Sequence, residues 1–241
     1  MNGVLARIWG MLSRTPPAKP PARAEPPSRR GKKWQLPEGE QGIEALGHRS
    51  YVGGKWDLMG RLQFDYLVAQ GLLPRHCLLD IACGSLRAGR YFIPYLAPGH
   101  YLGLDKEEGL IAAGKEQELE PGLLETKRPQ FVVSSAFEFA LFDKRPDFAL
   151  AQSLFTHLPP RLITACLANL RAVIADDGVF YATIFETDEE RQQPGEPHDH
   201  GIFYYTAAEM AALGRDTGWS MHYIGDWSHP KNQRMLCYRP A

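Results

Sequence analysis

Two acidic residues stand at the ends of apolar runs in the middle of the chain. Asp80 lies in the stretch "LLDIACGSLRAG", and Asp105 ends the stretch "HYLGLD". Apolar runs of this length are typical of buried strands, and the small residues after Asp80 are typical of a tight turn that leads into a helix. In an open α/β sheet such a turn lies at the carboxyl edge, where helix amino ends offer unpaired N–H donors. The two acids therefore predict a ligand-binding site at that edge.

Two common ligands of such a turn fit this sequence poorly. A phosphate-binding loop shares the spacing of the glycines at 84 and 89 but continues with Lys and then Ser or Thr, whereas this chain continues with Arg90 and Tyr91. A dinucleotide-binding turn has the pattern GxGxxG, and this chain has Ala82 and Arg87 at the first and third glycine positions. Arg87 is hard to place against a pyrophosphate, so the sequence disfavours both ligands.

Apolar runs alternate with helical patterns along the chain, and the strands and helices that they predict must position the two acids. The predicted strands are 77–82, 100–105, 130–135, 147–152 and 178–185. The predicted helices are 55–71, 87–96, 106–119, 159–175 and 206–216. The fourth helix has proline at its start, and Thr206 with Glu209 forms a capping box for the fifth. Such alternation favours a mostly parallel sheet with helices on both faces.

The end of the chain does not follow this alternation of strands and helices. Residues 186–203 are polar and predict a long loop or insertion. Two last apolar runs, 219–227 and 233–239, are joined only by "SHPKN", which is too short for a crossover helix. These two strands must therefore be antiparallel. We predict an α/β fold with a doubly wound, mostly parallel seven-stranded sheet and a C-terminal antiparallel hairpin.

The stretch "LLDIACGSLRAG" followed by Asp105 resembles the motifs of the Rossmann-like class I S-adenosylmethionine-dependent methyltransferases. Asp80 takes the place of the family's first acid, and Ala82, Gly84 and Leu86 follow at the positions of its glycine turn, with substitutions at 82 and 86. The closing antiparallel hairpin is also typical of this family. The resemblance covers about residues 50–240. It implies S-adenosylmethionine as the cofactor.

The resemblance assigns cofactor contacts to the turn and to the ends of the strands. Gly84 would let the backbone approach the methionine portion closely, and Ser85 and the helix amino end at Arg87 would meet its carboxylate. Asp80 would orient the turn, and Asp105 would accept the ribose hydroxyls. The other expected contacts are Ala82 in the turn, Lys106 beside the adenine, Ser135, Ala136 and Phe137 after the third strand, and Gln152 after the fourth.

Methyl transfer to a hydroxyl is an in-line displacement that needs a base close to the acceptor. His157 follows the fourth predicted strand in "SLFTHLPP" and is the first candidate for this catalytic role. His198 and His200 in "PHDHG" are the next candidates, because the predicted insertion is long enough to fold over a substrate. These two histidines, which lie on either side of Asp199, could also coordinate a metal, but a further ligand that completes the set cannot be located, so no metal site is predicted.

The stretch "CGSLRAGR" is similar to bacterial methyltransferases that act mostly on small molecules or sugars. The predicted function is therefore O-methylation of a small-molecule or sugar-type acceptor. Two alternatives stay open: a protein or peptide methyltransferase, and a protein that binds S-adenosylmethionine without turnover.

Residues 1–34 differ in composition from the rest of the chain. They contain eight Lys or Arg against one Glu and many prolines, so they cannot pack a core. Val4, Ile8, Trp9 and Leu12 would share one face of a short amphipathic helix. We predict a basic tail over 1–34 and a methyltransferase domain over 35–241. The tail is either a disordered segment or a peripheral contact to an anionic membrane surface.

Charge and cysteine usage limit the partners and the compartment. The whole chain has a net charge of -1, so the part after residue 34 has a charge of about -8, which disfavours a nucleic-acid partner. The four cysteines have neither CxxC nor metal-ligand spacing, which predicts buried thiols in a reducing compartment. We expect a cytoplasmic protein, which in the second of the two alternatives for the tail would contact the inner membrane surface. Composition does not determine the oligomeric state.

Overall fold

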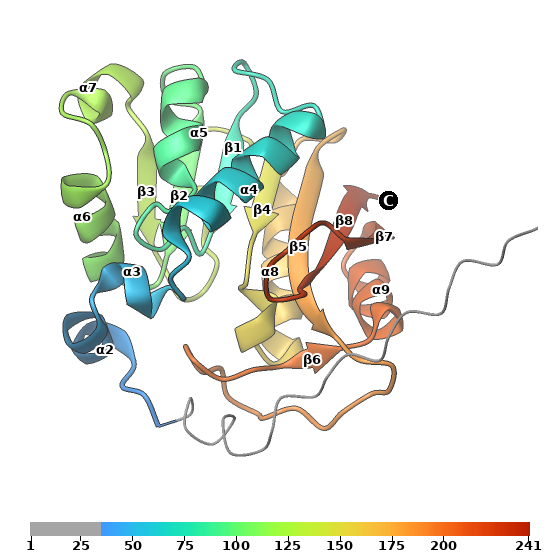
Figure 1. Cartoon of the computed structure of the whole chain (residues 1–241). Helices are drawn as coiled ribbons and strands as arrows, with labels where there is room; N and C mark the ends of the chain where they lie inside the picture. The colour runs from blue at the N-terminus through green and yellow to red at the C-terminus, as the bar shows by residue number, and fades with distance from the viewer. Residues whose placement is uncertain (1–34) are drawn as a thin grey trace, which may run out of the picture.

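The computed structural model describes residues 35–241, which form one α/β sheet structure (Figure 1). The main strand order is β3-β2-β1-β4-β5-β8-β7, with β1 to β5 parallel and β8 antiparallel to both of its neighbours. These strands are β1 Leu78–Ile81, β2 Tyr101–Asp105, β3 Gln130–Val133, β4 Phe148–Ala151, β5 Val179–Glu186, β7 Trp219–Asp226 and β8 Arg234–Pro240. The two-residue strand β6, Tyr204–Tyr205, pairs with the end of β5. The predicted mostly parallel sheet with an antiparallel C-terminal hairpin is confirmed.

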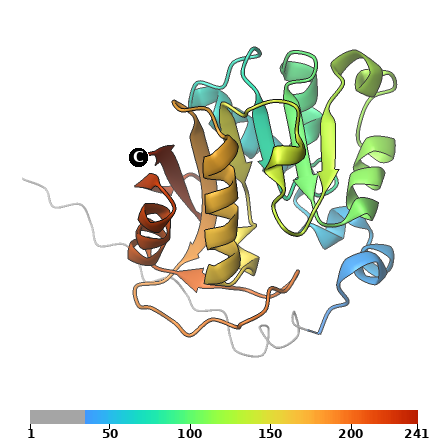
Figure 2. The same ribbon diagram turned by 180° about the vertical axis from the view of Figure 1, so that it is seen from behind.

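Helices cover both faces of this sheet (Figures 1 and 2). One face carries α4 Trp56–Ala69, α5 Gly89–Tyr95 and α6 Glu108–Gln117, and the other carries α8 Pro160–Val173 and α9 Ala207–Asp216. Shorter elements are α2 Gly39–Leu46, α3 His48–Tyr51, α7 Leu123–Lys127 and the 3₁₀ turns Phe139–Leu141 and Phe155–His157. The doubly wound arrangement follows from this covering of both faces.

Successive residues of a strand point to opposite faces, so the core has two layers. Leu79 and Ile81 of β1 belong to the cluster that includes Ile163 of α8. Leu78 belongs to the cluster that includes Leu67 of α4. All five side chains are fully buried. Because apolar side chains fill both faces, the carboxyl edge is where polar groups of the strands can gather.

Two helix starts test the sequence predictions directly. The capping box of α9 is confirmed, since Thr206 Oγ1 accepts the N–H of Glu209 at 3.0 Å and the Glu209 carboxylate accepts the N–H of Thr206 at 2.7 Å. The predicted start of α5 at Arg87 is wrong by two residues. Leu86 has a left-handed φ of 63°, which extends the turn, and the helix begins only at Gly89.

Two irregular segments meet at the carboxyl edge of the sheet. One contains α2 and α3, which the sequence did not predict, and the other is the predicted insertion, called here the insertion loop (residues 187–203). The backbone nitrogen of Gly39 lies 3.3 Å from Asp199 Oδ2, although the two residues are 160 positions apart. These segments therefore close one side of the edge together.

None of the helices in residues 35–241 has the length and apolar character needed to cross a membrane. The predicted amphipathic helix of the basic tail lies outside the described residues.

Candidate active site

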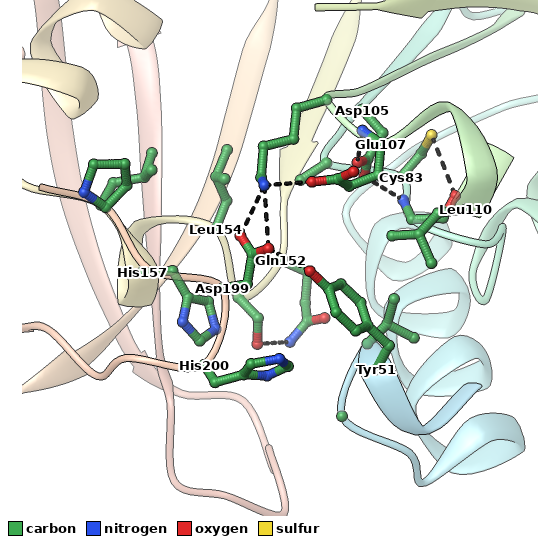
Figure 3. A pocket seen from close by; sticks show the side chains of 18 of the residues that line it. Tyr51, Cys83, Asp105, Glu107, Leu110, Gln152, Leu154, His157, Asp199 and His200 are labelled. Atoms are coloured by element: carbon green, nitrogen blue, oxygen red, sulfur yellow. Dashed lines mark hydrogen bonds and ion pairs between the residues drawn. The ribbon is translucent and has the colours of Figure 1, made fainter. Parts of the chain in front are cut away.

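A cavity of about 660 Å³ lies at the carboxyl edge of the parallel strands (Figure 3). This volume is within the usual range for small-molecule sites. Its wall comes from the turn after β1, the residues after β2, β3 and β4, the insertion loop and residues 36–53, called here the N-terminal segment. Ser85 and Ala136 are the predicted site residues that do not line this cavity. The predicted site residues that do line it are Asp80, Ala82, Gly84, Arg87, Asp105, Lys106, Ser135, Phe137, Gln152, His157, His198 and His200.

The turn after β1 holds three residues in the left-handed conformation. The φ angle is 60° at Ala82, 54° at Gly84 and 63° at Leu86. Glycine adopts this conformation freely, whereas Ala82 and Leu86 each carry a cost of about 1–2 kcal/mol. A Cβ added to Gly84 would lie 3.0 Å from Val52 Cγ1. The substitutions at 82 and 86 therefore keep the backbone path of a glycine turn.

The Asp105 carboxylate joins this turn to β2. Its Oδ2 accepts the N–H of Gly84 at 2.8 Å, and its Oδ1 accepts the N–H of Glu107 at 3.0 Å. Burial raises the pKa of Asp105 to about 6, against the lowering effect of these two hydrogen bonds and of Lys106. Asp105 is thus a buried anion at neutral pH, fixed in place at the cavity wall.

Asp80 is the second buried carboxylate of the wall. It accepts a hydrogen bond from the Tyr101 hydroxyl at 2.8 Å. Burial raises the pKa of Asp80 to about 6, the Tyr101 hydrogen bond opposes the rise, and the charge of Asp105 adds to it. A positively charged ligand group in the cavity would stabilise the ionised form of both carboxylates, which burial disfavours. The electrostatics therefore favour a cationic ligand.

Arg87, a predicted cofactor contact, has protein groups as its hydrogen-bond partners. It precedes helix α5, and its guanidinium donates to the carbonyl oxygens of Val52 at 2.9 Å and Gly54 at 3.0 Å. It also donates to Gln152 Oε1 at 2.8 Å. Arg87 lines the cavity, but its hydrogen bonds tie the turn before α4 to the end of β4.

Ser85 belongs to the turn but does not line the cavity. It is fully buried against α6, where a Cβ added to Gly114 would come 2.7 Å from the Ser85 carbonyl carbon. Its hydroxyl has no hydrogen-bond partner among the described residues. The expected contact of Ser85 with a ligand carboxylate is therefore not supported by its position.

The residues after β3 divide between the wall and the core. Ser135 and Phe137 line the cavity, whereas Ala136 does not, and its carbonyl accepts a hydrogen bond from the Asn169 side chain at 3.1 Å. Phe137 also packs with Phe139 in the core, with ring centroids 6.1 Å apart.

Three predicted histidines meet at the insertion loop but have different ring partners (Figure 3). His157 Nδ1 lies 2.6 Å from the Gly201 carbonyl oxygen, and Nδ1 carries the proton because a carbonyl only accepts. His198 Nδ1 instead accepts the N–H groups of His200 and Gly201, each at 3.1 Å. His200 Nε2 lies 3.1 Å from the Pro37 carbonyl oxygen and donates to it. In the neutral state, His157 is the one of these three with an unprotonated Nε2.

Sequence reasoning missed several residues of the wall. Glu38, Glu107 and Gln233 all line the cavity. Glu38 comes from a segment with no predicted element, and Gln233 lies where the last strand was predicted to begin. Glu107 directly follows the predicted contacts Asp105 and Lys106, so its position in the sequence could have indicated that it lines the cavity.

In residues 35–241, no group of three or more His, Cys, Asp or Glu side chains is arranged to hold a metal ion. His198, Asp199 and His200 instead contact protein groups of the N-terminal segment and of the loop itself.

Comparison with known proteins connects this site to one family. The sequence pattern of a methyltransferase domain matches residues 79–180, from β1 to the start of β5. The magnesium protoporphyrin IX methyltransferase of Synechocystis PCC 6803 with bound SAH is 16% identical, has a TM-score of 0.60, and aligns over 84% of this chain and 96% of that chain. The CcbJ methyltransferase of Streptomyces caelestis is 15% identical, with a TM-score of 0.60 and coverage of 79% and 92%.

A glycopeptide N-methyltransferase, MtfA, complexed with S-adenosylmethionine is 13% identical, has a TM-score of 0.56, and covers 76% of this chain and 94% of that chain. At these identities the similarity establishes the shared fold. The matched domain contains the left-handed turn and both buried carboxylates, and the sheet closes with the antiparallel strands that the sequence resemblance implied. Residues 79–180 thus match a methyltransferase domain, and the chain shares its fold with these methyltransferases.

Proposed function

We propose that this protein binds S-adenosylmethionine in the cavity and transfers its methyl group to a hydroxyl of a small molecule. The observation that carries the proposal is the pair of buried carboxylates, Asp80 and Asp105, beside the left-handed turn at Gly84. S-adenosylmethionine has a sulfonium and an ammonium group, and both are cations that such a pair favours. Similar structures were determined with SAM or SAH bound, which supports the same cofactor here.

The residues of the wall fit this cofactor by their chemistry. Asp105 would accept from the ribose hydroxyls with its remaining lone pairs, and Asp80 would face the positive end of the methionine portion. Gly84 leaves the space that a side chain would fill, since its added Cβ would already crowd Val52. Phe137 offers an aromatic face for the adenine.

When bound, S-adenosylmethionine supplies a methyl group on a sulfonium that is already activated for displacement. The protein must then orient the acceptor hydroxyl and remove its proton. His157 would hold that proton on Nε2, because the Gly201 carbonyl keeps the other ring proton on Nδ1. Leu154, Phe185 and Ile202 also line the cavity and would exclude water from a small acceptor.

The names of similar structures support a small acceptor. They include the magnesium protoporphyrin IX methyltransferase and the pyocyanin biosynthetic protein PhzM, which is 18% identical with a TM-score of 0.56 and covers 83% of this chain and 64% of that chain. The similarity to a glycopeptide N-methyltransferase supports a peptide-type acceptor as the alternative for this chain.

Calorimetry tests the cofactor assignment. We expect S-adenosylmethionine and S-adenosylhomocysteine to bind in the micromolar range, which corresponds to about -8 kcal/mol. Asp105→Ala removes a charged acceptor and should weaken binding by about 1.5–3 kcal/mol. Because the pKa of Asp105 is about 6, wild-type affinity should fall as the pH drops through that value, and the variant should lose less. Saturable heat with NAD and none with S-adenosylmethionine would contradict the assignment.

Transfer of a labelled methyl group tests the acceptor class. The purified chain is incubated with methyl-labelled S-adenosylmethionine and a metabolite extract, and the products are separated by mass. Label in small products supports the proposal, and label in polypeptides supports the peptide alternative. Cofactor binding without label in either fraction identifies a binding protein without turnover.

A further inference from the structure

Asp199 lies at the centre of a group of polar contacts between the insertion loop and neighbouring segments. Its carboxylate accepts a hydrogen bond from the Tyr51 hydroxyl and lies 2.9 Å from Lys106 Nζ. The N–H of Gly39 lies 3.3 Å from the same carboxylate, and the N–H of Asp199 donates to Glu38 Oε2 at 2.9 Å. The insertion loop is thereby joined to α3, to the residue after β2 and to the start of α2 (Figure 3).

The charges of this group hold Asp199 as an anion. Burial acts to raise the pKa of Asp199, but the hydrogen bonds from Tyr51 and Lys106 outweigh it and keep the pKa below its ordinary value. Burial and the Asp199 carboxylate raise the pKa of Tyr51, so its hydroxyl remains a donor. The contact is therefore a charge-assisted one, which is stronger than a hydrogen bond between neutral groups.

The residues on either side of Asp199 continue to His157. The N–H of His198 lies 3.3 Å from the His157 carbonyl oxygen, and the N–H of Phe203 donates to the Thr156 carbonyl at 2.9 Å. The His198 ring accepts the N–H of Gly201, whose carbonyl receives the Nδ1 proton of His157. A displacement of the loop tip would therefore move the carbonyl that determines the His157 tautomer.

We propose that Asp199 is a positioning residue for the acceptor half of the site: its contacts with Tyr51 and Lys106 hold the turn at residues 198–201 where the Gly201 carbonyl fixes the His157 proton on Nδ1. The role of His157 as a base rests on the proposed function. The placement of its proton does not, because it follows from the contacts of the loop alone.

The test is nitrogen-15 NMR of the full chain labelled at its histidine rings, which distinguishes a proton on Nδ1 from one on Nε2. The His157 signals are assigned with His157→Gln. We expect the wild type to have the His157 proton on Nδ1. Asp199→Asn removes the charge, and Tyr51→Phe removes only one hydroxyl. Both should shift the His157 signals toward the Nε2-protonated form.

Asp188→Asn is the matched control, because it makes the same change at an exposed position of the same loop. It should leave the His157 signals unchanged. A wild-type His157 pattern in both Asp199→Asn and Tyr51→Phe, with native circular dichroism, would overturn the proposal. Tyr51→Phe keeps the test decisive if Asp199→Asn fails to fold. Calorimetry with S-adenosylmethionine on the same samples separates this result from a failure of the proposed function.

Discussion

At the scale of single residues, the proposed chemistry of the site depends on which nitrogen of His157 carries a proton. The Gly201 carbonyl accepts from Nδ1 at 2.6 Å, so the neutral ring has its lone pair on Nε2. His198 uses its Nδ1 as an acceptor for two backbone N–H groups, which makes it a cap of the loop turn. His157 is thus better suited than His198 to take a proton from an acceptor.

Replacing His157 tests this assignment. We expect His157→Ala to lower turnover by about 10²–10⁴ while leaving the affinity for S-adenosylmethionine nearly unchanged, because the base acts on the acceptor. Steady-state kinetics and calorimetry measure the two effects. The control is His222→Ala on β7, where the histidine is exposed. Full turnover of His157→Ala at saturating acceptor would show that positioning alone supports catalysis.

The buried carboxylates give the stability of the ligand-free protein a distinctive pH dependence. The pKa of Asp80 is raised to about 6, mainly by burial, so its folded state binds a proton more tightly than its unfolded state. Its stabilising contribution is full below about pH 4 and is lost as the pH rises through about 6, with a total change of up to about 3 kcal/mol.

Asp80→Asn should therefore raise the melting temperature by a few degrees at pH 7.5 and by less at pH 5, because the amide stays neutral at both values. Scanning calorimetry without ligand measures the difference. Asp177→Asn, at an exposed turn, should change little at either pH. A loss of stability in Asp80→Asn that is equal at the two pH values would mean that the lost Tyr101 contact outweighs the charge.

At the scale of elements, helix α6 packs against the turn after β1. A Cβ added to Gly114 would lie 2.7 Å from Leu86 Cγ and from the Ser85 carbonyl carbon, both in the turn after β1. A Cβ added to Gly109 of the same helix would lie 3.5 Å from Glu40 Oε1, which is an ordinary contact. The two glycines therefore have opposite consequences for substitution.

Gly109→Ala should stabilise the protein by about 0.5–1 kcal/mol, because alanine favours the helix. Gly114→Ala should destabilise it by about 1–3 kcal/mol through overpacking and should weaken S-adenosylmethionine binding by moving the turn. Denaturant titration and calorimetry measure these effects. If the two variants have the same stability, the packing of α6 against the turn is looser than these distances indicate.

The alternation of strands and helices was predictable, because buried strands must be apolar runs and helices must show periodic apolar faces. The capping box of Thr206 and Glu209 also follows from local chemistry. The helices α2 and α3 have only eight and four residues, so their sequence carries little periodicity. Their contacts with the insertion loop join residues 160 positions apart, and no local pattern encodes such a meeting.

That Asp80, Asp105 and Gln152 lie at one edge could be predicted, since parallel strands bring their carboxyl ends together, and all three line the cavity. The side-chain partners were not predictable. Arg87 binds two carbonyl groups of the turn before α4, and Ser85 faces a helix that approaches closely only because Gly114 lacks a side chain. Such roles depend on tertiary contacts rather than on position in a motif.

At the scale of the whole molecule, charge is divided unequally between the tail and the domain. Residues 1–34 carry eight basic residues and one acidic residue, while the whole chain has a net charge of -1. The domain is therefore acidic and would be repelled by an anionic membrane surface. The basic tail would instead be attracted to that surface. We propose that the tail is dispensable for catalysis and brings the enzyme to such a surface.

Vesicle sedimentation tests this role of the tail. The full chain should sediment with vesicles that contain anionic lipid, and a variant starting at Trp34 should not, with each basic residue near the surface contributing about 1 kcal/mol. The binding should weaken at high salt. Neutral vesicles are the control. Equal sedimentation of the two proteins would exclude the tail as an anchor.

The contacts of Asp199 cross the wall of the cavity, from the insertion loop to Tyr51 on α3 and Lys106 after β2. A ligand can pass through this part of the wall only after those contacts break. For a ligand that takes this route, the residence time would be governed by the opening of the protein as well as by its own affinity. A spent cofactor on this route would leave at the pace of the loop, and product release would then compete with methyl transfer as the slowest step of the cycle.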